Sequence, residues 1–553
     1  MADAAAYAAK PWLALYTPGV PSTIEPAARD LLSLFASAVA RAGDGAAIHY
    51  FDRSISYREL DAMSDALATA LVERGFAAGD RLAVFLQNMP QFLVAALATW
   101  KAGGIVVTVN PMNREHELML MFADSEPKAL VCLDALWREV VEPLPASVKR
   151  PQIVVTTSSR DFQSRNDARV FGASTAPVAV APPDLLALLA EYEGRAPRER
   201  ARANPDEPAF LVYTSGTTGV PKGAMNTHAN IACSNVAMAH WFSLADGDAI
   251  FGMAPLFHVT GLVAHVALSW ALVAPVILFY RFEPGLALDA LIERRPAWTV
   301  SAITAFIALM NNKAATPDHW SSLKAIVSGG APIPPSVVEE FRSRTGKYIL
   351  NGYGLTETSA GVIAVPHKRE APVDSASGAL AIGVPKFGVD AWIANDEGEA
   401  MPVGETGEIV VSGPTVVPGY WRKPRETAES MRPDGFRTGD VGFMDAQGWF
   451  YLVDRKKDVI VASGYKVWPR EVEDVLYTHP AVREVAVVGV KDSYRGETVK
   501  AVVSLKSGAH ATAAELTEWC GKQLAAYKRP HEVEIRDELP KTVTGKILRR
   551  LLK

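Results

Sequence analysis

The alternation of short apolar runs with amphipathic helices is the feature that most constrains the fold of this chain. RLAVFL (81–86) and IVVTVN (105–110) are rich in branched apolar residues and predict buried strands. PQFLVAALATWKAGG (90–104) lies between them and predicts a helix, because proline stands at its start and glycine at its end. A hairpin is expected just before this unit, over residues 47–57. This order predicts an α/β fold with a mostly parallel sheet covered by helices.

The chain has 553 residues, which is longer than a single hydrophobic core usually supports. Several folding units are therefore expected. Alanine, proline and arginine dominate residues 158–208, which we interpret as a connector between two subdomains. Short strands with glycine turns, as in GEIVVSG and GWFYLVD, predict a small β unit further on. We divide the chain into an N-terminal domain, 1–457, with subdomains at about 1–200, 201–377 and 378–457, and a C-terminal α+β domain, 458–553.

Charge and cysteine content exclude several classes of protein. The net charge of −5 gives no general electrostatic reason to bind nucleic acid. Cys132, Cys233 and Cys520 are far apart and form no CxxC pair, which argues against a disulfide framework and a cysteine-bound zinc. The first residues lack the basic and apolar blocks of a secretory signal. We therefore expect a cytoplasmic protein, with peripheral membrane association as the alternative.

The longest apolar stretch, VTGLVAHVALSWALVAPVILFY (259–280), has the length of a membrane span. His265 lies inside it, however, and Pro275 divides it. We interpret it as a buried helix that ends near Val273, followed by a buried strand through Tyr280.

YTSGTTGVPKG (213–223) has the composition of a phosphate-binding loop. Its glycines let backbone N–H groups approach phosphate oxygens, its hydroxyls add donors, and Lys222 adds a positive charge. The spacing departs from the Walker pattern GxxxxGK[ST], because Gly223 stands where that pattern has Ser or Thr. Taken alone, the stretch fits a surface turn equally well.

Three further stretches carry side chains suited to a nucleotide, and each also has an ordinary structural reading. NGYGLTET (351–358) predicts a glycine turn after a strand, with a tyrosine ring for a purine and Glu357 for Mg²⁺, or an ordinary strand-to-helix turn capped by Thr356. RTGD (437–440) offers Asp440 to a ribose diol after a tight turn, although aspartate is common in turns. PKTVTGKILRR (540–550) offers Lys546 on a glycine loop, or it is a solvated basic tail.

Together these stretches resemble the adenylate-forming superfamily of acyl-CoA synthetases, luciferases and peptide-synthetase adenylation domains. The similarity covers almost the whole chain, and the motifs follow the family's order. They are YTSGTTGVPKG, PLFHVTG (255–261), SGGAP (328–332), NGYGLTET, RTGD, DRKKD (454–458), SGYKVWPREVE and PKTVTGKILRR. One such motif is weak evidence, whereas eight in order are specific. KPWLALY, GGIVVTVNP and AAYKRP are most similar to bacterial long-chain fatty acyl-CoA ligases.

The resemblance implies a two-step reaction with ATP, Mg²⁺ and coenzyme A. A carboxylate first attacks the α-phosphate of ATP to give acyl-AMP and pyrophosphate. The thiol of coenzyme A then displaces AMP to give a thioester. The implied fold is a large N-terminal domain of two βαβ-type lobes plus a β unit, with a small mobile C-terminal domain over it.

The resemblance also implies roles for individual residues. Thr214 and Glu357 would hold Mg²⁺, and Asp440 with Arg455 would hold the ribose. Lys546 would bridge the carboxylate and the α-phosphate as the main catalytic residue, together with Thr356, Glu357 and His258. The ATP and AMP contacts would come from Thr214, Ser215, Gly216, Thr217, Thr218, Gly219, Lys222, Gly330, Ala331, Pro332, Asn351, Gly352, Tyr353, Gly354, Thr356, Asp440, Arg455 and Lys546.

For the second step, the resemblance implies that the small domain rotates about a hinge at Lys457. This gating by domain movement would bring the loop of Gly464, Tyr465 and Lys466 into the site.

His258 has two readings, since a histidine among apolar residues is often a core residue. The family places an aromatic or histidine gate here, which favours positioning of the acyl carboxylate over general-base catalysis, because a carboxylate is already ionised at neutral pH. The acyl pocket is expected from mostly small or apolar residues, namely His258, Val259, Thr260, Gly261, Ala302, Thr304, Ala305 and Gly329.

The substrate we expect is a fatty acid. No Asp or Glu occurs between Leu256 and Tyr280 to pair with an ammonium group, which argues against an amino acid. Medium-chain, dicarboxylic and aryl acids are the alternatives, and the rival of another class is a non-catalytic nucleotide-binding protein on the same fold. The expected partners are small molecules, with no nucleic acid and no transmembrane span, and the chain is expected to be a monomer or a homodimer.

Overall fold

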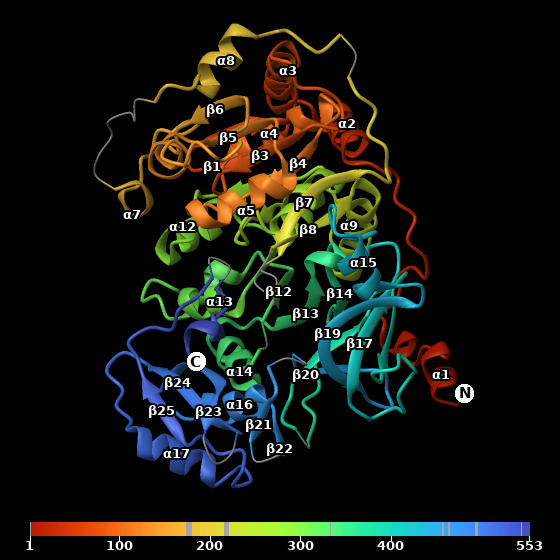
Figure 1. Cartoon of the computed structure of the whole chain (residues 1–553), viewed down its shortest axis with the longest axis vertical. Coiled ribbons are helices and arrows are strands. Elements are labelled where there is room, and N and C mark those ends of the chain that lie inside the picture. The colour runs from red at the N-terminus through yellow and green to blue at the C-terminus, as the bar shows by residue number, and fades with distance from the viewer. Residues whose placement is uncertain are drawn as a thin grey trace.

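The computed structural model describes residues 2–172, 180–198, 200–214, 221–331, 333–375, 377–455, 458–462, 465–492, 496–542 and 545–553. Figure 1 shows two lobes stacked one above the other, a β-rich part beside the second lobe, and a smaller domain at the lower end. The predicted fold class is confirmed: a large α/β N-terminal domain is followed by a small α+β C-terminal domain.

The first lobe is built on a six-stranded sheet of order β6-β5-β3-β4-β7-β8, in which only β8 runs antiparallel to its neighbour. β5 is buried along its whole length, as expected for a parallel strand with both faces covered. The strands are β3 Arg81–Phe85, β4 Ile105–Thr108, β5 Ala129–Leu133, β6 Ile153–Thr157, β7 Pro208–Thr214 and β8 Lys222–Thr227. The helices of this region are α2 Leu31–Ala42, α3 Tyr57–Glu73, α4 Pro90–Lys101, α5 Glu115–Ser125, α6 Asp134–Leu136, η2 Trp137–Val141, α7 Ala168–Phe171 and α8 Leu185–Glu191.

A fourteen-stranded sheet runs through the second lobe and on into the β-rich part. Its strands are β1 Ala46–Tyr50, β2 Arg53–Ser56, β9 Ile250–Phe251, β10 Val276–Leu278, β11 Trp298–Ser301, β12 Ala325–Gly329, β13 Ile349–Leu355, β14 Ala360–Ala364, β15 Ala381–Pro385, β16 Asp390–Ala394, β17 Gly407–Ser412, β18 Met431–Arg432, β19 Gly435–Met444 and β20 Phe450–Arg455. The helices of this part are α9 His228–Trp241, α10 Val259–Gly261, η3 Leu262–Ala267, α11 Leu268–Ala271, α12 Pro284–Arg294, α13 Ile303–Met310, η4 Pro317–Trp320, α14 Pro335–Thr345, η5 Thr356–Thr358 and α15 Pro424–Ser430.

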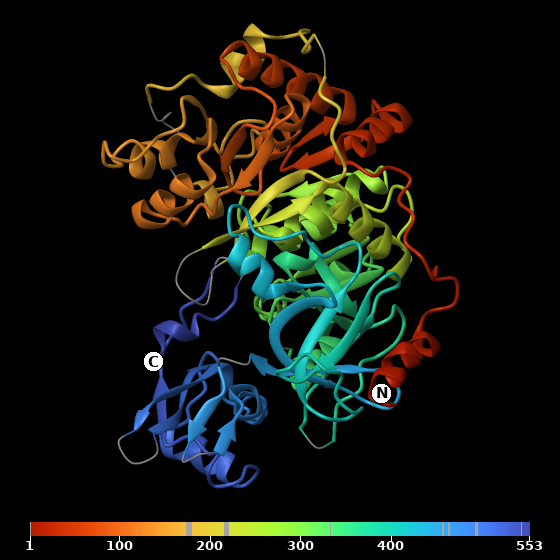
Figure 2. The same ribbon diagram turned by 45° about the vertical axis from the view of Figure 1, so that its right-hand side comes forward.

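The C-terminal domain has its own sheet and its own apolar core. Its elements are β21 Ile460–Ala462, β22 Tyr465–Val467, α16 Pro469–Tyr477, β23 Val482–Asp492, β24 Gly496–Leu505, α17 Ala513–Gly521, β25 Glu532–Ile535 and η6 Arg549–Leu551. Figure 2 shows this domain, in blue, set to one side of the large body. At the other end of the chain, α1 (Ala2–Ala8) and η1 (Pro11–Leu15) lie beside the β-rich part.

The sheets do not follow the predicted divide at about residue 200. β7 and β8 lie beyond that point but complete the first sheet, and the hairpin of β1 and β2 belongs to the second sheet. The β unit is also continuous with the second lobe, because β14 pairs with β15. Pairing between distant segments decides which strand joins which sheet, and local sequence pattern does not carry that information.

The apolar stretch over 259–280 forms a buried helix and a strand, as predicted. α10, η3 and α11 follow one another through Ala271, and β10 lies between β9 and β1 in the second sheet. η3 is a π-helical segment, and the indole of Trp298 donates a hydrogen bond of 3.0 Å to the carbonyl of Ala264 within it. Among the described residues, no helix combines the length and the apolar character needed to cross a bilayer.

Two lysines are buried in this fold, in surroundings of different charge. Lys101 on α4 is 3% exposed and its ammonium pairs with Asp61 at 2.6 Å and Asp65 at 3.0 Å. Lys386 follows β15 and is 1% exposed, and burial lowers its pKa to about 7. A buried ammonium costs free energy unless it is paired, so Lys386 loses its charge more easily than a surface lysine.

We predict that Lys386 makes the stability of this protein depend on pH in the alkaline range. The unfolded chain keeps the proton up to about pH 10.5, whereas the folded chain releases it above about pH 7. The free energy of unfolding therefore rises with pH across this window, by up to about 1.4 kcal/mol per pH unit. Lys386→Met, measured by urea unfolding at several pH values, should be more stable near pH 7 and should lose this slope.

Lys101→Met is the matched control, because it removes a buried lysine that has acidic partners. It should destabilise the protein at every pH in the window, since Asp61 and Asp65 would lose their cation. An unchanged pH slope in Lys386→Met would contradict the account of Lys386.

Candidate active site

The carboxyl ends of the parallel strands β11, β12 and β13 lie side by side at one edge of the second sheet. In open α/β sheets this edge is where ligands bind. It gathers Ala302 after β11, Gly329 and Gly330 at the end of β12, and Gly352 in β13. Gly330 has a φ of +78° and turns the chain after β12. A Cβ on Gly329 would lie 2.7 Å from the carbonyl oxygen of Gly352, so the two strands approach more closely than a side chain would allow.

NGYGLTET does not form the predicted turn. β13 continues through Leu355, and only Thr356–Thr358 leave it as one turn of 3-10 helix, η5. A Cβ on Gly354 would lie 2.1 Å from the carbonyl oxygen of Ala360, so glycine here serves close strand approach. The amide of Asn351 donates to the carbonyl of Ala381 at 3.1 Å, which ties β13 to β15.

Tyr353 and Asp440 meet at this edge, from motifs far apart in sequence. The Tyr353 hydroxyl donates to Oδ2 of Asp440 at 2.8 Å, and both side chains are buried. RTGD was predicted to present Asp440 after a tight turn, but the whole motif lies within β19, where Asp440 is opposite Arg455 of β20. β17 and β19 pair at Glu408 with Val441 and at Val410 with Arg437. Between these pairs, residues 438–440 of β19 face the single residue Ile409 of β17, so β19 bulges there.

Glu357 is held by a tyrosine that the sequence analysis did not single out. Tyr420 donates from its hydroxyl to Oε1 of Glu357 at 2.8 Å, and Val417 donates from its backbone N–H to the Glu357 carbonyl at 2.9 Å. Burial and the negative charge of Glu357 raise the pKa of Tyr420, so its hydroxyl stays protonated. The signal in the sequence was PGYW (418–421), an aromatic pair after glycine that is typical of a core turn.

Lys222 lies over the ring of the same tyrosine, Tyr420. Its ammonium is 4.7 Å from the ring centroid of Tyr420. Thr214, the last residue of β7, is the cross-strand partner of Lys222 in β8, so the two frame the mouth of the predicted phosphate loop. β7 and β8 pair around the predicted phosphate loop and are called the phosphate hairpin below. Asn226 of β8 donates to the carbonyl of Thr356 at 2.9 Å, which fixes this hairpin to η5.

Glu357 and Thr214 fit the ligand chemistry of a magnesium ion, which prefers oxygen donors. Within the described part of the chain, no cluster of three or more His, Cys, Asp or Glu side chains is placed to hold a metal. In nucleotide sites, magnesium takes most of its ligands from phosphate oxygens and water, and one or two protein oxygens complete its shell.

His258 caps the amino end of α10 and is half-buried beside the second sheet. Its Nδ1 accepts from the backbone N–H of Thr260 at 3.3 Å. Burial and the nearby positive charge of Lys546 lower the pKa of His258 to about 4, so the imidazole is neutral at physiological pH. A neutral, half-buried ring suits positioning better than general-base catalysis.

The backbone before His258 is clamped from two sides. Asn88 donates to the carbonyls of Gly252 and Ala254 at 3.1 and 3.0 Å, and accepts from the N–H of Leu256 at 2.8 Å. His265 accepts from the N–H of Ala254 at 3.0 Å through Nε2. Burial lowers the pKa of His265 to about 4, so this ring too is a neutral acceptor.

Lys546 comes to this edge because its loop is docked on α13. The Thr304 hydroxyl donates to the carbonyl of Gly545 at 3.3 Å, and the Lys546 N–H donates to the Thr542 hydroxyl at 3.0 Å. Gly545 has a φ of +80°, and a Cβ on it would lie 2.1 Å from the Thr304 hydroxyl oxygen. A second contact joins the domains where Arg470 of α16 donates to the carbonyl of Leu452 in β20 at 2.9 Å.

The contacts of the structure locate only some residues of the predicted acyl pocket. Val259 and Gly261 are buried, and a Cβ on Gly261 would lie 2.2 Å from the Pro255 carbonyl oxygen, so this glycine serves backbone packing. Thr304 turns its hydroxyl to the Gly545 loop.

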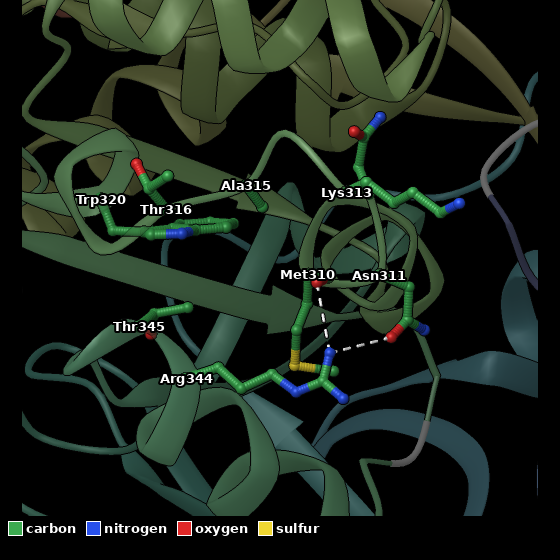
Figure 3. Close-up of a pocket in the computed structure, with 9 residues that line it drawn as sticks. Met310, Asn311, Lys313, Ala315, Thr316, Trp320, Arg344 and Thr345 are labelled. Carbon is green, nitrogen blue, oxygen red and sulfur yellow. Dashed lines mark hydrogen bonds between the residues drawn. The ribbon is translucent and has the colours of Figure 1, made fainter.

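A hollow of about 380 Å³ lies at the far end of α13, and Figure 3 shows Arg344 bonded there to Met310 and Asn311. It includes none of the predicted pocket residues. It is lined by Met310, Asn311, Asn312, Lys313, Ala315, Thr316, Trp320, Arg344 and Thr345.

Several predicted site residues lie outside the described residues. They are Ser215, Gly216, Thr217, Thr218, Gly219, Pro332, Lys457 and Gly464. The side chains of Arg455, Tyr465 and Lys466 lie outside the description as well. Their roles remain predictions. Among the described residues, the structure places five predicted side chains from four motifs in this region. Lys222 and Glu357 share Tyr420 as a partner, Tyr353 bonds to Asp440, and His258 lies near Lys546.

Comparison with known proteins identifies relatives over nearly the whole chain. The model of the AMP-binding enzyme family matches residues 35–421, and that of the AMP-binding enzyme C-terminal domain matches residues 471–546. A long-chain-fatty-acid–CoA ligase of Bacillus subtilis is 37% identical, over 98% of this chain and 97% of its own. One of Escherichia coli is 34% identical, over 98% of each. The ATP-bound structure of MatB from Rhodopseudomonas palustris has a TM-score of 0.82 at 30% identity, and the match covers 94% of this chain and 98% of that one.

Proposed function

The chain belongs to the AMP-binding enzyme family and is an acyl-CoA ligase that works through an adenylate; on that premise we propose that its substrate is a long-chain fatty acid. The support is twofold. Curated relatives of this length are long-chain-fatty-acid–CoA ligases. The segment from Leu256 to Tyr280 beside His258 carries no acidic side chain and is mostly buried and apolar, which suits an uncharged acyl chain.

The proposed first step brings two anions together at the sheet edge. A carboxylate oxygen of the fatty acid bonds to the α-phosphorus of ATP, and the bond from that phosphorus to the pyrophosphate oxygen breaks. Lys546 supplies positive charge between the two reactants, where charge builds up in the transition state. The observation that carries this role is the docking of Gly545 on Thr304, with the charge of Lys546 acting on His258.

The nucleotide is held on the other side of the site in this proposal. Asp440 accepts from the ribose hydroxyls, and Tyr353, already bonded to Asp440, lies against the adenine. Thr214 and Glu357 would hold Mg²⁺, which neutralises charge on the phosphates when it is bound. Lys222 lies at the β- and γ-phosphates and steadies the leaving pyrophosphate.

The second step needs different surroundings at the same place. The sulfur of coenzyme A bonds to the acyl carbon, the bond from that carbon to the AMP oxygen breaks, and the thiol proton goes to solvent. Lys546 must first withdraw, which in this proposal happens by rotation of the C-terminal domain at Lys457. The loop of Gly464, Tyr465 and Lys466 then takes its place.

The proposed place of this reaction is a reducing cytoplasm. The support is that Cys132, Cys233 and Cys520 are all free thiols and all buried.

The substrate proposal predicts the ranking of acids in a turnover assay. AMP release with coenzyme A should give the highest kcat/KM for a long-chain fatty acid, because each buried methylene adds about 0.8 kcal/mol of apolar transfer. Medium-chain, dicarboxylic and aryl acids should follow. A dicarboxylic or aryl acid at the top of the ranking would overturn the fatty-acid proposal. No turnover with any acid would favour the non-catalytic nucleotide-binding alternative.

The role of Lys546 predicts a separation of binding from chemistry. Lys546→Ala should lower the rate of acyl-AMP formation about a hundredfold or more, because the transition-state charge loses its cation. ATP affinity, measured by calorimetry, should stay close to that of the wild type.

Lys541→Ala is the matched control, since Lys541 lies in the same loop but pairs with Glu484 at 2.6 Å. It should keep near wild-type rates of acyl-AMP formation. Wild-type rates in Lys546→Ala as well would refute the role assigned to Lys546.

A further inference from the structure

The segment 414–422 lies along the outer edge of the phosphate hairpin and carries Tyr420. It is fixed there by backbone bonds, from Trp421 N–H to the Gly223 carbonyl at 2.8 Å and from Met225 N–H to the Gly419 carbonyl at 3.0 Å. Behind it, the N–H of Tyr420 donates to the Thr427 hydroxyl at 3.0 Å. Hydrogen bonds of the backbone therefore hold Tyr420 in place independently of the contacts of its side chain.

The side chain of Tyr420 joins two groups of opposite charge. It is 5% exposed, its hydroxyl donates to Oε1 of Glu357 at 2.8 Å, and its ring faces the ammonium of Lys222 at 4.7 Å. A hydrogen bond to one carboxylate oxygen limits how the carboxylate can turn, and an aromatic face limits where a long flexible lysine rests. One rigid side chain thus restricts both.

We propose that Tyr420 is a positioning residue for magnesium and ATP, which orients the Glu357 carboxylate through its hydroxyl and the Lys222 ammonium through its ring. This inference rests on the proposed function, in which Glu357 holds the metal and Lys222 lies at the phosphates. The groups that align a metal-binding carboxylate often change metal affinity by ten- to a hundredfold when they are removed. Tyr420 fixes the carboxylate and the lysine at a set spacing, so the two reach one magnesium–triphosphate unit together.

Tyr420 is also part of a small apolar cluster with Ala224 and Val417, and a purely structural role must be separated from positioning. Tyr420→Phe keeps the ring, the packing and the contact with Lys222 but removes the hydroxyl. Tyr420→Leu removes the ring contact as well. The matched control is Tyr451→Phe, because Tyr451 donates to Asp445 at 3.1 Å in β20, away from the phosphate hairpin.

Calorimetry of ATP binding at a series of Mg²⁺ concentrations is the first test, because it does not depend on turnover. In Tyr420→Phe, the Mg²⁺ concentration that gives half-maximal ATP binding should rise about tenfold or more. ATP binding without Mg²⁺ should change little. Tyr420→Leu should also weaken ATP binding without Mg²⁺, by about three- to tenfold, because Lys222 loses its aromatic partner. Tyr451→Phe should match the wild type in both respects.

Acyl-AMP formation gives the second readout. In Tyr420→Phe the rate should approach the wild-type value at high Mg²⁺, whereas Glu357→Gln should stay slow at every Mg²⁺ concentration. Tyr420→Phe placed in the Glu357→Gln background should have little further effect on Mg²⁺ dependence, since the hydroxyl acts through that carboxylate.

Two outcomes would overturn the proposal. A Tyr420→Phe protein with wild-type Mg²⁺ dependence would show that the hydroxyl has no positioning role, whatever its melting temperature. A shift equal to that of Tyr451→Phe would show a general effect of losing a buried hydroxyl. Failure of the proposed function is recognised separately, by a wild-type protein that makes no acyl-AMP while its Mg²⁺-dependent ATP binding is still measurable.

Discussion

The contact between the Gly545 loop and the amino end of α13 is the interaction on which the rest of the site depends. The described nucleotide-side groups of the candidate site lie in the large N-terminal domain, whereas Lys546 comes from the C-terminal domain through this docked loop. Gly545 makes the contact possible, because it adopts a positive φ and leaves room for the Thr304 hydroxyl. The positive charge of Lys546 contributes to lowering the pKa of the half-buried His258. Charge acts strongly in such surroundings because little water screens it.

This division of the site follows from the chemistry of joining two anions. In the proposed mechanism, Asp440 and Glu357 hold the nucleotide and must stay in place through both half-reactions, and they lie on paired strands or next to them. The cation that relieves the repulsion is needed only in the first. In the proposed mechanism, placing Lys546 on a second domain lets the same position serve coenzyme A afterwards, without rebuilding the nucleotide site.

The sequence predicted the fold class, because hydrophobic periodicity and motif order are local properties. It also singled out Lys222, Asp440 and Glu357, whose contacts the structure describes and whose roles stay predictions. It failed where glycine serves close approach between strands: NGYGL was predicted to be a turn, but Gly354 permits close contact with Ala360. The hairpin of β7 and β8 was assigned to the wrong lobe, since strand partners are chosen by distant contacts. Tyr420 was missed because an aromatic after glycine is typical of a core turn, and only its contacts reveal Glu357 and Lys222 as partners.

The most direct test of the docking contact is the rate of each half-reaction in Gly545→Ala. The added methyl group strains the positive-φ backbone of the loop and clashes with Thr304 when the loop is docked, so acyl-AMP formation should fall about tenfold or more. Thioester formation from supplied acyl-AMP should stay near the wild-type rate. Thr304→Ala in the same protein should restore part of the first rate, because it removes the oxygen that clashes. Equal losses in both half-reactions, with no rescue, would contradict the account.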